Sequence, residues 1–454
     1  MISQTPMTAD LDLLAGRAWI YAAAEIFIMT TASAAELDQL LTALIQSAEG
    51  ISDLLFITGK PPLAEIHGRL LPPPNSAEPI LTSTRIESLA FAIIKGNERL
   101  VEDLAKTGSC DCSYSLTGVC RFRVNIYRQN GNYAMVLRRL SSQIPSMEKL
   151  GLAPVFYDII KEKTGLVFVT GGTGSGKTTT LAALLNEINL TSEVHVVTLE
   201  DPIEFLHPQL KAAFSQREMG HDFYSFPDGL RAALRQAPKI ILVGEIRDRE
   251  TMEIALTAGE TGHVVFSTLH TISAGQTINR ILGMFNKDEE QQVRERLVGS
   301  LRYIVGQRLV PKKGGGRILV TELMGSSLRT REAIELGEAE NRRLADIIEA
   351  GNAGGWHSFE QSLLKAYEDD LVTEETALLY SVNKPAMRQR LDLAHSRGRR
   401  SVNAHAAVQM ITVPAAVVPP PPPVLVPTPP PTAAPVNPPS ARNGVLKNML
   451  NSLI

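Results

Sequence analysis

The sequence predicts an α/β protein that carries a smaller α+β domain ahead of it and a proline-rich tail behind it. Three observations support this fold class. From about Met147 to Ala386, short apolar runs alternate with helical patterns, as is typical of α/β folds. An earlier region contains one helical pattern followed by short strand-like segments. Thirteen of the 28 prolines lie between Val413 and Ser440, and a segment of this composition cannot form a core.

Length, charge and hydropathy limit the classes of function. With 454 residues, the chain is long enough for two or three folded units. The formal net charge of −3 lacks the basic excess of a general nucleic-acid binder, so we expect no nucleic acid as a partner. The longest early apolar stretch, from Ala18 to Met29, contains Glu25 and is shorter than the ~20 residues of a membrane span. We interpret residues 1–34 as an N-terminal extension rather than an export signal.

The first folded region is expected over residues 35–140 and begins with an apolar-periodic helix. The clearest strand runs from Cys120 to Tyr127, where apolar residues alternate with polar ones that include Arg121 and Arg123. This alternation predicts one buried and one cationic face. On its own, the cationic face is interpreted as solvated surface. The dipeptide Asn130-Gly131 predicts a hairpin turn.

The three cysteines, Cys110, Cys112 and Cys120, also belong to this region and lie within eleven residues of each other. Such clustering raises the alternative of a zinc site. Three thiols without a nearby histidine fall short of the four ligands that structural zinc takes. We therefore interpret them as reduced thiols of a cytosolic protein.

The second folded region, residues 141–391, is expected to form a parallel sheet with helices on both faces. Its predicted strands are short apolar runs separated by helical patterns. Beyond Asn286 the chain looks mainly helical, except for the last predicted strand. The predicted strands are Gly165–Thr170, Val194–Glu200, Lys239–Glu245, Gly262–His270 and Arg317–Met324.

Residues 171–178 have the sequence Gly-Gly-Thr-Gly-Ser-Gly-Lys-Thr and match the phosphate-binding loop G-x-x-x-x-G-K-[ST]. The loop follows an apolar strand and opens an amphipathic helix, which is the context that the motif requires. Glycines let backbone N–H groups surround phosphates, Lys177 reaches the β- and γ-phosphates, and the Thr178 hydroxyl binds Mg²⁺. We expect ATP and Mg²⁺ as cofactors. The residues predicted to bind the nucleotide are Gly171, Gly172, Thr173, Gly174, Ser175, Gly176, Lys177, Thr178 and Thr179.

Three other predicted strands carry groups suited to catalysis. Glu245 and Glu200 each end a strand, and a third strand has His263 near its start and His270 at its end. The carboxyl ends of parallel strands face the ligand crevice of such a sheet. We therefore expect a catalytic constellation at these strand ends.

Gly244 indicates how the roles divide among these groups. It occupies the position where many phosphate-loop ATPases carry the first acid of an Asp-Glu pair. Glu245 is therefore interpreted as the general base or water-orienting group. Thr178 and either Glu200 or Asp201 are then left to hold Mg²⁺.

The segments around this predicted site resemble the secretion and pilus motor ATPases. The aspartate box, Walker B element and histidine box of that family occur here in the family's order and spacing. The resemblance extends from about Leu37 to Leu391. In residues 121–125 and 355–361 it is similar to the PilT-like branch, the type IV pilus retraction ATPases. The three boxes are Thr198–Glu204, Leu242–Asp248 and Thr261–Thr271.

The resemblance implies an architecture. Residues 35–140 would form a PAS-like domain and residues 141–391 a RecA-like ATPase domain, in subunits that assemble into a homohexameric ring. ATP would bind between the domains, where arginines of the N-terminal domain close on its phosphates. Arg123 and Arg138 match the positions of those arginines, so the resemblance favours a catalytic role for the cationic strand face.

The resemblance also implies a function. It predicts a motor in which ATP hydrolysis drives type IV pilus retraction and twitching motility, in the cytoplasm at the inner face of the inner membrane. The motor would associate peripherally with that membrane through a pilus platform protein. An accessory retraction ATPase and the ATPase of a type II or type IV secretion system are the alternatives. A non-hydrolysing nucleotide switch or scaffold and a DNA motor are interpretations from other classes.

Two features depart from the family pattern. The family segment needed for retraction usually contains A-I-R-x-G, whereas this chain has Glu335 at the arginine position. The proline-rich tail, residues 392–454, lies beyond the resemblance. A tether with a terminal docking helix and a disordered segment are both open interpretations of this tail. Its last residues place apolar side chains at helical spacing, at Leu446, Met449, Leu450 and Leu453.

Overall fold

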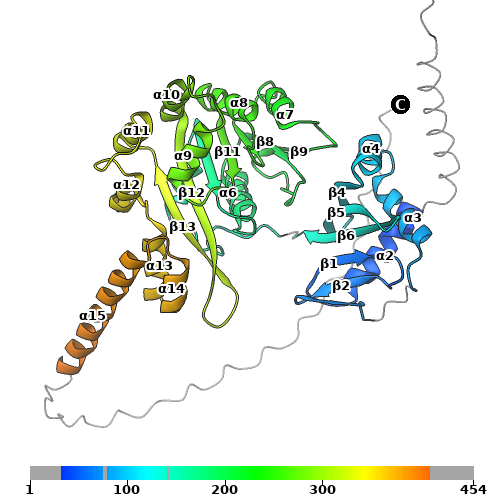
Figure 1. Ribbon diagram of the computed structural model, residues 1–454, viewed down its shortest axis with the longest axis horizontal. Coiled ribbons are helices and arrows are strands. Elements are labelled where there is room, and N and C mark those ends of the chain that lie inside the picture. Colours follow the sequence, from blue (N-terminus) through cyan, green and yellow to red (C-terminus); the bar gives the residue numbers. More distant parts are fainter. Residues whose placement is uncertain (1–31, 75–78, 141–142, 409–454) are drawn as a thin grey trace, which may run out of the picture. The chain divides into compact units, whose positions relative to one another are not determined.

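The computed structural model describes residues 32–74, 79–140 and 143–408, with side chains described up to residue 396 (Figure 1). The described residues up to His395 belong to one unit. Most of the predicted N-terminal extension, and the proline tract with its predicted terminal helix, lie outside the described residues. Among the helices that are described, none is both long and apolar enough to cross a membrane.

The first sheet has six antiparallel strands in the order β3-β2-β1-β6-β5-β4. Helices accompany it, so this part of the chain is α+β, as predicted. Its likeness to a PAS domain stays a prediction. The strands are β1 (Ile51–Phe56), β2 (Leu63–Ile66), β3 (Arg69–Leu71), β4 (Ser109–Leu116), β5 (Cys120–Gln129) and β6 (Asn132–Leu140). The helices are α2 (Ala34–Gln46), α3 (Ser83–Ile94) and α4 (Glu98–Thr107).

The strand with the cationic face is β5, and its alternation is confirmed. Phe122, Val124 and Ile126 are fully buried, whereas Arg123 is exposed. The predicted turn is confirmed as well, because Asn130 and Gly131 both have positive φ angles, 46° and 76°, between β5 and β6. The three cysteines are free thiols buried in the core of this sheet.

The second sheet has seven strands in the order β13-β12-β7-β11-β10-β8-β9. All neighbouring strands are parallel except β12 and β13, which form an antiparallel pair at one edge. The predicted α/β class is therefore confirmed. The strands are β7 (Gly165–Thr170), β8 (His195–Glu200), β9 (Ala213–Glu218), β10 (Ile240–Val243), β11 (Val264–Leu269), β12 (Leu301–Pro311) and β13 (Arg317–Gly325).

The structure corrects the predicted strand set. The region beyond Asn286 is mainly helical, as expected, but it also contains β12 at residues 301–311, which was not predicted, and β9 was not predicted either. Polar residues within both strands hid them. Gln307 of β12 donates from Nε2 to the Thr180 hydroxyl at 2.8 Å, while its buried Oε1 has no hydrogen-bond partner among the described residues. The strand predicted as Lys239–Glu245 is shorter, and Glu245 lies two residues beyond its end.

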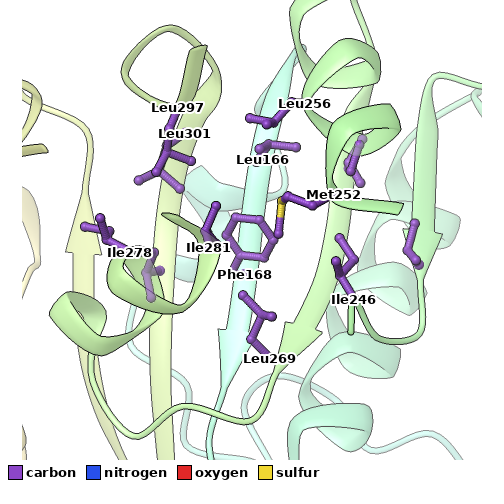
Figure 2. Close-up of a cluster of buried hydrophobic side chains, with 14 of the residues drawn as sticks. Leu166, Phe168, Ile246, Met252, Leu256, Leu269, Ile278, Ile281, Leu297 and Leu301 are labelled. Atoms are coloured by element: carbon purple, nitrogen blue, oxygen red, sulfur yellow. The ribbon is translucent and has the colours of Figure 1, made fainter. Parts of the chain in front are cut away.

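Helices cover both faces of this sheet. Leu166 and Phe168 of β7 face one core, and Val167 and Val169 face another, since successive strand residues point to opposite sides. Figure 2 shows the first core, in which Phe168 lies between Ile281 and Met252, residues of two different helices. The helices on this face are α7 (Phe226–Ala233), α8 (Arg249–Glu260), α9 (Ala274–Leu282) and α10 (Glu290–Ser300), and those on the other are α5 (Phe156–Ile159) and α6 (Lys177–Thr191).

The remaining helices follow the β12–β13 hairpin. A further core joins Val310 and Val320 of the hairpin to Phe359, Leu363 and other buried side chains of the last three helices. The segments are α11 (Leu328–Glu335), α12 (Leu344–Ala350), a 3₁₀ turn (Gly351–Gly354), α13 (Phe359–Glu368), α14 (Glu374–Tyr380) and α15 (Lys384–Val408).

Candidate nucleotide-binding and catalytic site

The glycine loop joins β7 to α6, which is the strand–loop–helix order that the motif predicted. Gly171, Gly174 and Gly176 have φ angles of +147°, +76° and +90°. A Cβ atom at Gly171 would lie 2.6 Å from the carbonyl oxygen of Gln307. Only glycine therefore fits where the loop leaves the strand.

Lys177 begins α6 and is buried among backbone carbonyls. Its Nζ donates hydrogen bonds of 3.0 Å to the carbonyl oxygens of Gly171 and Gly172. Burial lowers the pKa of Lys177, whereas the carboxylates of Glu245 and Glu204 act in the opposite direction. The ammonium is thus held inside the loop, where phosphate oxygens would be stronger partners than neutral carbonyls.

Glu245 lies just beyond the carboxyl end of β10. The Thr268 hydroxyl of β11 donates to the carbonyl oxygen of Gly244 at 2.7 Å and fixes the start of this turn. A Cβ atom at residue 244 would lie 3.1 Å from the carbonyl oxygen of Leu199. The glycine that replaces the usual acid therefore sits where the neighbouring strand leaves little room for a side chain.

The Glu245 carboxylate has two cationic or ionisable neighbours. Oε1 forms an ion pair with Arg247 Nη2 at 2.6 Å, and Oε2 lies 3.6 Å from His270 Nε2. Desolvation and the nearby Lys177 ammonium lower the pKa of His270, so its imidazole is neutral at pH 7. The structure thus brings Glu245 and His270 together from two adjacent strand ends.

Glu200 ends β8 and is almost fully buried. Its Oε1 accepts from the Thr198 hydroxyl at 2.7 Å and from Gln216 Nε2 at 3.2 Å. Burial raises the pKa of Glu200 to about 7, although both hydrogen bonds favour the ionised form. A carboxylate in this state gains from a cation placed beside it.

A cavity of about 350 Å³ collects these groups. It is lined by the phosphate loop, by the carboxyl ends of β8, β10 and β11, and by one residue of the first sheet, Arg123. The charged and polar residues of its lining are Arg123, Thr173, Lys177, Thr178, Glu200, Asp201, Glu204, His207, Glu245, Arg247, Thr268 and His270.

Two of the residues predicted to be catalytic lie elsewhere. Arg138 of β6 is exposed, and its Nε donates to Asp53 at 2.8 Å. His263 precedes the amino end of β11, at the opposite end of that strand from His270, and its Nδ1 lies 3.1 Å from the carbonyl oxygen of Ala258. Neither residue lines the cavity.

The oxygen donors of this cavity suit a divalent cation that is also bound by the phosphates of a nucleotide. Among the described residues, no group of three or more histidine, cysteine or acidic side chains could hold a metal ion alone. Mg²⁺ in nucleotide sites takes one or two protein oxygens and completes its shell with phosphates and water. Thr178 and Glu200 line the same cavity and supply such oxygens.

Sequence reasoning missed Glu218, which ends β9 and lies beside the aspartate box. Its carboxylate accepts hydrogen bonds from the Ser113 hydroxyl at 2.5 Å, from Arg121, and from the Ile203 backbone N–H at 3.1 Å. Arg121 lies on the same face of β5 as Arg123, two residues along. The contact therefore joins the strand that supplies Arg123 to the loop that follows Glu200. Glu218 could have been identified only if β9 had been predicted as a strand, and the polar sequence of β9 does not indicate one.

A glycine loop between a parallel strand and a helix, with lysine inside it and carboxylates at the neighbouring strand ends, defines a P-loop nucleoside triphosphatase. The sequence profile of the family described as Type II/IV secretion system protein matches residues 115–350. The chain belongs to this family and is an ATPase.

Similar proteins extend the comparison. The type IV pilus retraction ATPase PilT of Pseudomonas aeruginosa is 40% identical over 333 residues, which is 72% of this chain and 94% of that protein. The type IV pilus ATPase PilU of the same organism is 34% identical over 359 residues, which is 79% of this chain and 92% of that protein. Among solved structures, the pilus retraction motor PilT with bound ADP is 37% identical with a TM-score of 0.71, covering 78% of this chain and 98% of that one. The ATPase DotB of Legionella pneumophila is 29% identical with a TM-score of 0.68, covering 77% and 96%.

Proposed function

We propose that the chain is the ATP-driven motor of type IV pilus retraction. The observation that carries the chemistry is the cavity in which Lys177, Glu245 and His270 converge. The similarity to PilT over almost the whole length of that protein supports retraction rather than extension of the pilus.

The residues of the cavity divide the work of hydrolysis. Backbone N–H groups of the loop and Lys177 bind the phosphates of ATP, and Thr178 with Glu200 holds Mg²⁺, which when bound neutralises phosphate charge. Glu245 accepts a proton from the attacking water or orients it. His270 in its neutral form holds the Glu245 carboxylate. Arg123 supplies positive charge to the transition state from the first sheet.

The likeness to PilT also supports the larger assembly. The proposed motor is a homohexamer that works in the cytoplasm at the inner face of the inner membrane. Its partner there is a pilus platform protein, and association with the membrane is peripheral. The division into an extension (1–34), an N-terminal domain (35–140), an ATPase domain (141–391) and a tail (392–454) belongs to the same proposal.

A second candidate is an accessory retraction ATPase or a secretion ATPase. Glu335, at the end of α11, favours it, because the retraction motif resembled here carries arginine at that position. The similarity to PilU and DotB is compatible with this alternative.

Gene deletion and complementation in the source organism test the proposal. Cells without the chain are expected to accumulate pili and to lose twitching motility, because nothing drives retraction. Cells with only Glu245→Gln are expected to show the same defect, because the variant binds ATP without turnover. Glu253→Gln, which changes an exposed acid of α8, is the matched control and is expected to restore motility. Cells without pili would contradict retraction and indicate extension, and normal pili with a secretion defect would favour the second candidate.

A further inference from the structure

The segment that carries His270 is short and is fastened to the start of α9. β11 ends at Leu269 and α9 begins at Ala274, so only residues 270–273 lie between them. The Thr271 hydroxyl lies 2.7 Å from the Thr277 hydroxyl, and the Ser273 hydroxyl accepts from the Gln276 N–H at 3.3 Å. A displacement of the amino end of α9 therefore moves His270 as well.

A partly buried carboxylate from another element holds this helix end. Glu322 of β13 accepts a hydrogen bond of 2.8 Å from the backbone N–H of Ala274, the first residue of α9. A negative charge at a helix amino end is stabilised by the unpaired N–H groups and by the helix dipole. The Ser273 cap serves a different N–H, so the two contacts add to each other.

The surroundings of Glu322 keep its side chain in one place. Its partner across the β12–β13 pair is Gly306, where a Cβ atom would lie 3.5 Å from the Glu322 Cβ and 3.1 Å from the Phe359 ring. Burial and the Glu360 carboxylate raise the pKa of Glu322, whereas the Ala274 N–H and the Arg308 guanidinium favour its charged form. A side chain at residue 306 would therefore press on the Phe359 ring and reach contact distance of the Glu322 Cβ.

Arg308 and Glu360 tie the same region to the C-terminal helices. The Arg308 guanidinium lies 4.2 Å from the centre of the Phe359 ring, and its Nη1 donates to the Tyr380 carbonyl oxygen at 2.7 Å. Glu360 Oε1 accepts from the backbone N–H groups of Val382 and Asn383 at 2.8 and 2.9 Å. The two charged groups that act on Glu322, Arg308 and Glu360, are thus themselves fixed by bonds to residues 380–383.

We propose that Glu322 is a positioning residue for ATP hydrolysis: by holding the Ala274 N–H, it sets the amino end of α9 and thereby the distance between His270 and Glu245. This role rests on the proposed part of His270 in hydrolysis.

The test compares variants of the purified full-length protein in ATP turnover, KM for ATP, ADP affinity and thermal unfolding. Glu322→Ala is expected to lower kcat by about ten-fold or more, with KM and ADP affinity nearly unchanged, because small misplacement of a catalytic group is costly. Glu322→Gln keeps an acceptor oxygen and is expected to recover most of the rate. Ser327→Ala, which removes the cap of α11, is the control for loss of a helix-end contact and is expected to leave kcat unchanged.

A second route removes the donor and leaves the acid in place. Ala274→Pro lacks the N–H, and proline is well tolerated at the first position of a helix. The extended conformation of Ser273, with φ −155° and ψ 164°, is compatible with a following proline. Ala274→Pro is expected to reproduce the kcat defect of Glu322→Ala, and retention of the full rate by a folded Ala274→Pro protein would overturn the proposal.

The double variant separates this proposal from the proposed role of His270. If Glu322 acts through His270, His270→Ala combined with Glu322→Ala is expected to be no slower than His270→Ala alone. Multiplied defects would overturn the positioning role while leaving that of His270 intact. Full turnover by His270→Ala would instead refute the part of His270 in the proposed function. Parallel loss of kcat, ADP affinity and unfolding temperature in Glu322→Ala would show a structural role only.

Discussion

Glu200 is a buried carboxylate whose ionisation falls within the physiological pH range. Its pKa in the folded protein is about 7, because burial disfavours the charged form. In an unfolded chain a glutamate titrates near about 4.3. The folded state therefore holds this proton more tightly than the unfolded state does. The resulting penalty on stability is absent below about pH 4.3, grows up to about pH 7, and is constant above it.

Glu200→Gln removes this penalty and keeps an oxygen for the Gln216 amide. The variant without nucleotide or Mg²⁺ is expected to gain up to about 3 kcal/mol in free energy of unfolding at pH 8, with a gain that shrinks toward pH 5. Urea denaturation between pH 5 and pH 8 measures it. Glu193→Gln, at an exposed position, is the control and should show no such trend. An equal effect of Glu200→Gln at pH 5 and pH 8 would show that the charge is not its source.

Arg123 and Arg138 are both predicted arginines of the catalytic set, and the structure distinguishes them. Arg123 lines the cavity, whereas Arg138 pairs with Asp53 away from it. Arg123→Ala is expected to lower kcat by roughly a hundred-fold or more with little change in ADP affinity, since such arginines act mainly on the transition state. Arg138→Ala is the matched control. Phosphate release under saturating ATP compares the two, and equal defects would refute the distinction.

The predictable and unpredictable parts of the site have different physical origins. Residues of the phosphate loop are adjacent in sequence, and Glu200, Glu245 and His270 follow parallel strands whose ends must meet at one edge. Their positions therefore follow from local pattern and topology. His263 and Glu218 do not, because the first lies at the other end of its strand and the second ends a strand that the sequence hides.

At the scale of elements, the turn from β7 into the phosphate loop depends on one glycine. Gly171→Ala would place a methyl group 2.6 Å from the Gln307 carbonyl oxygen and strain a residue with φ +147°. We expect a loss of at least about 1–2 kcal/mol in stability and weaker nucleotide binding. Gly299→Ala, which lies outside the phosphate loop and where a Cβ atom meets nothing within 4 Å, is the control. Thermal unfolding and ADP titration measure both, and a harmless Gly171→Ala would contradict the steric account.

The central strands of the second sheet are predictable because both of their faces are buried. β7, β10 and β11 consist entirely of buried residues and give continuous apolar runs. β9 lies at one edge of the sheet, and its polar residues serve neighbouring loops: Gln216 bonds Glu200, and Glu218 bonds the Ile203 N–H. Because these polar side chains bond groups outside the sheet, β9 lacks the alternation of apolar and polar residues on which strand prediction relies.

At the scale of the molecule, the site draws on segments that are far apart in sequence. Arg123 comes from the first sheet, and the other polar groups come from the phosphate loop and three strand ends of the second. Glu218 bonds Ser113 and Arg121 of the first sheet together with the Ile203 N–H of the second. A motion that separates these groups would withdraw Arg123 from the cavity, which is how loss of the γ-phosphate could be coupled to mechanical work.

The described lining of the cavity comes from residues between Arg123 and His270, and this gives a prediction for truncated proteins. Met387 and Leu391 of α15 are fully buried in the core shared with β12, β13 and α13. A chain that ends at Val408 retains both residues and is expected to keep the ATP turnover and unfolding temperature of the full chain. A chain that ends at Asn383 loses both and is expected to lose several kcal/mol of stability. Turnover and thermal unfolding of the two truncated proteins decide this, and reduced turnover on removal of residues 409–454 alone would give the tail a part in the motor itself.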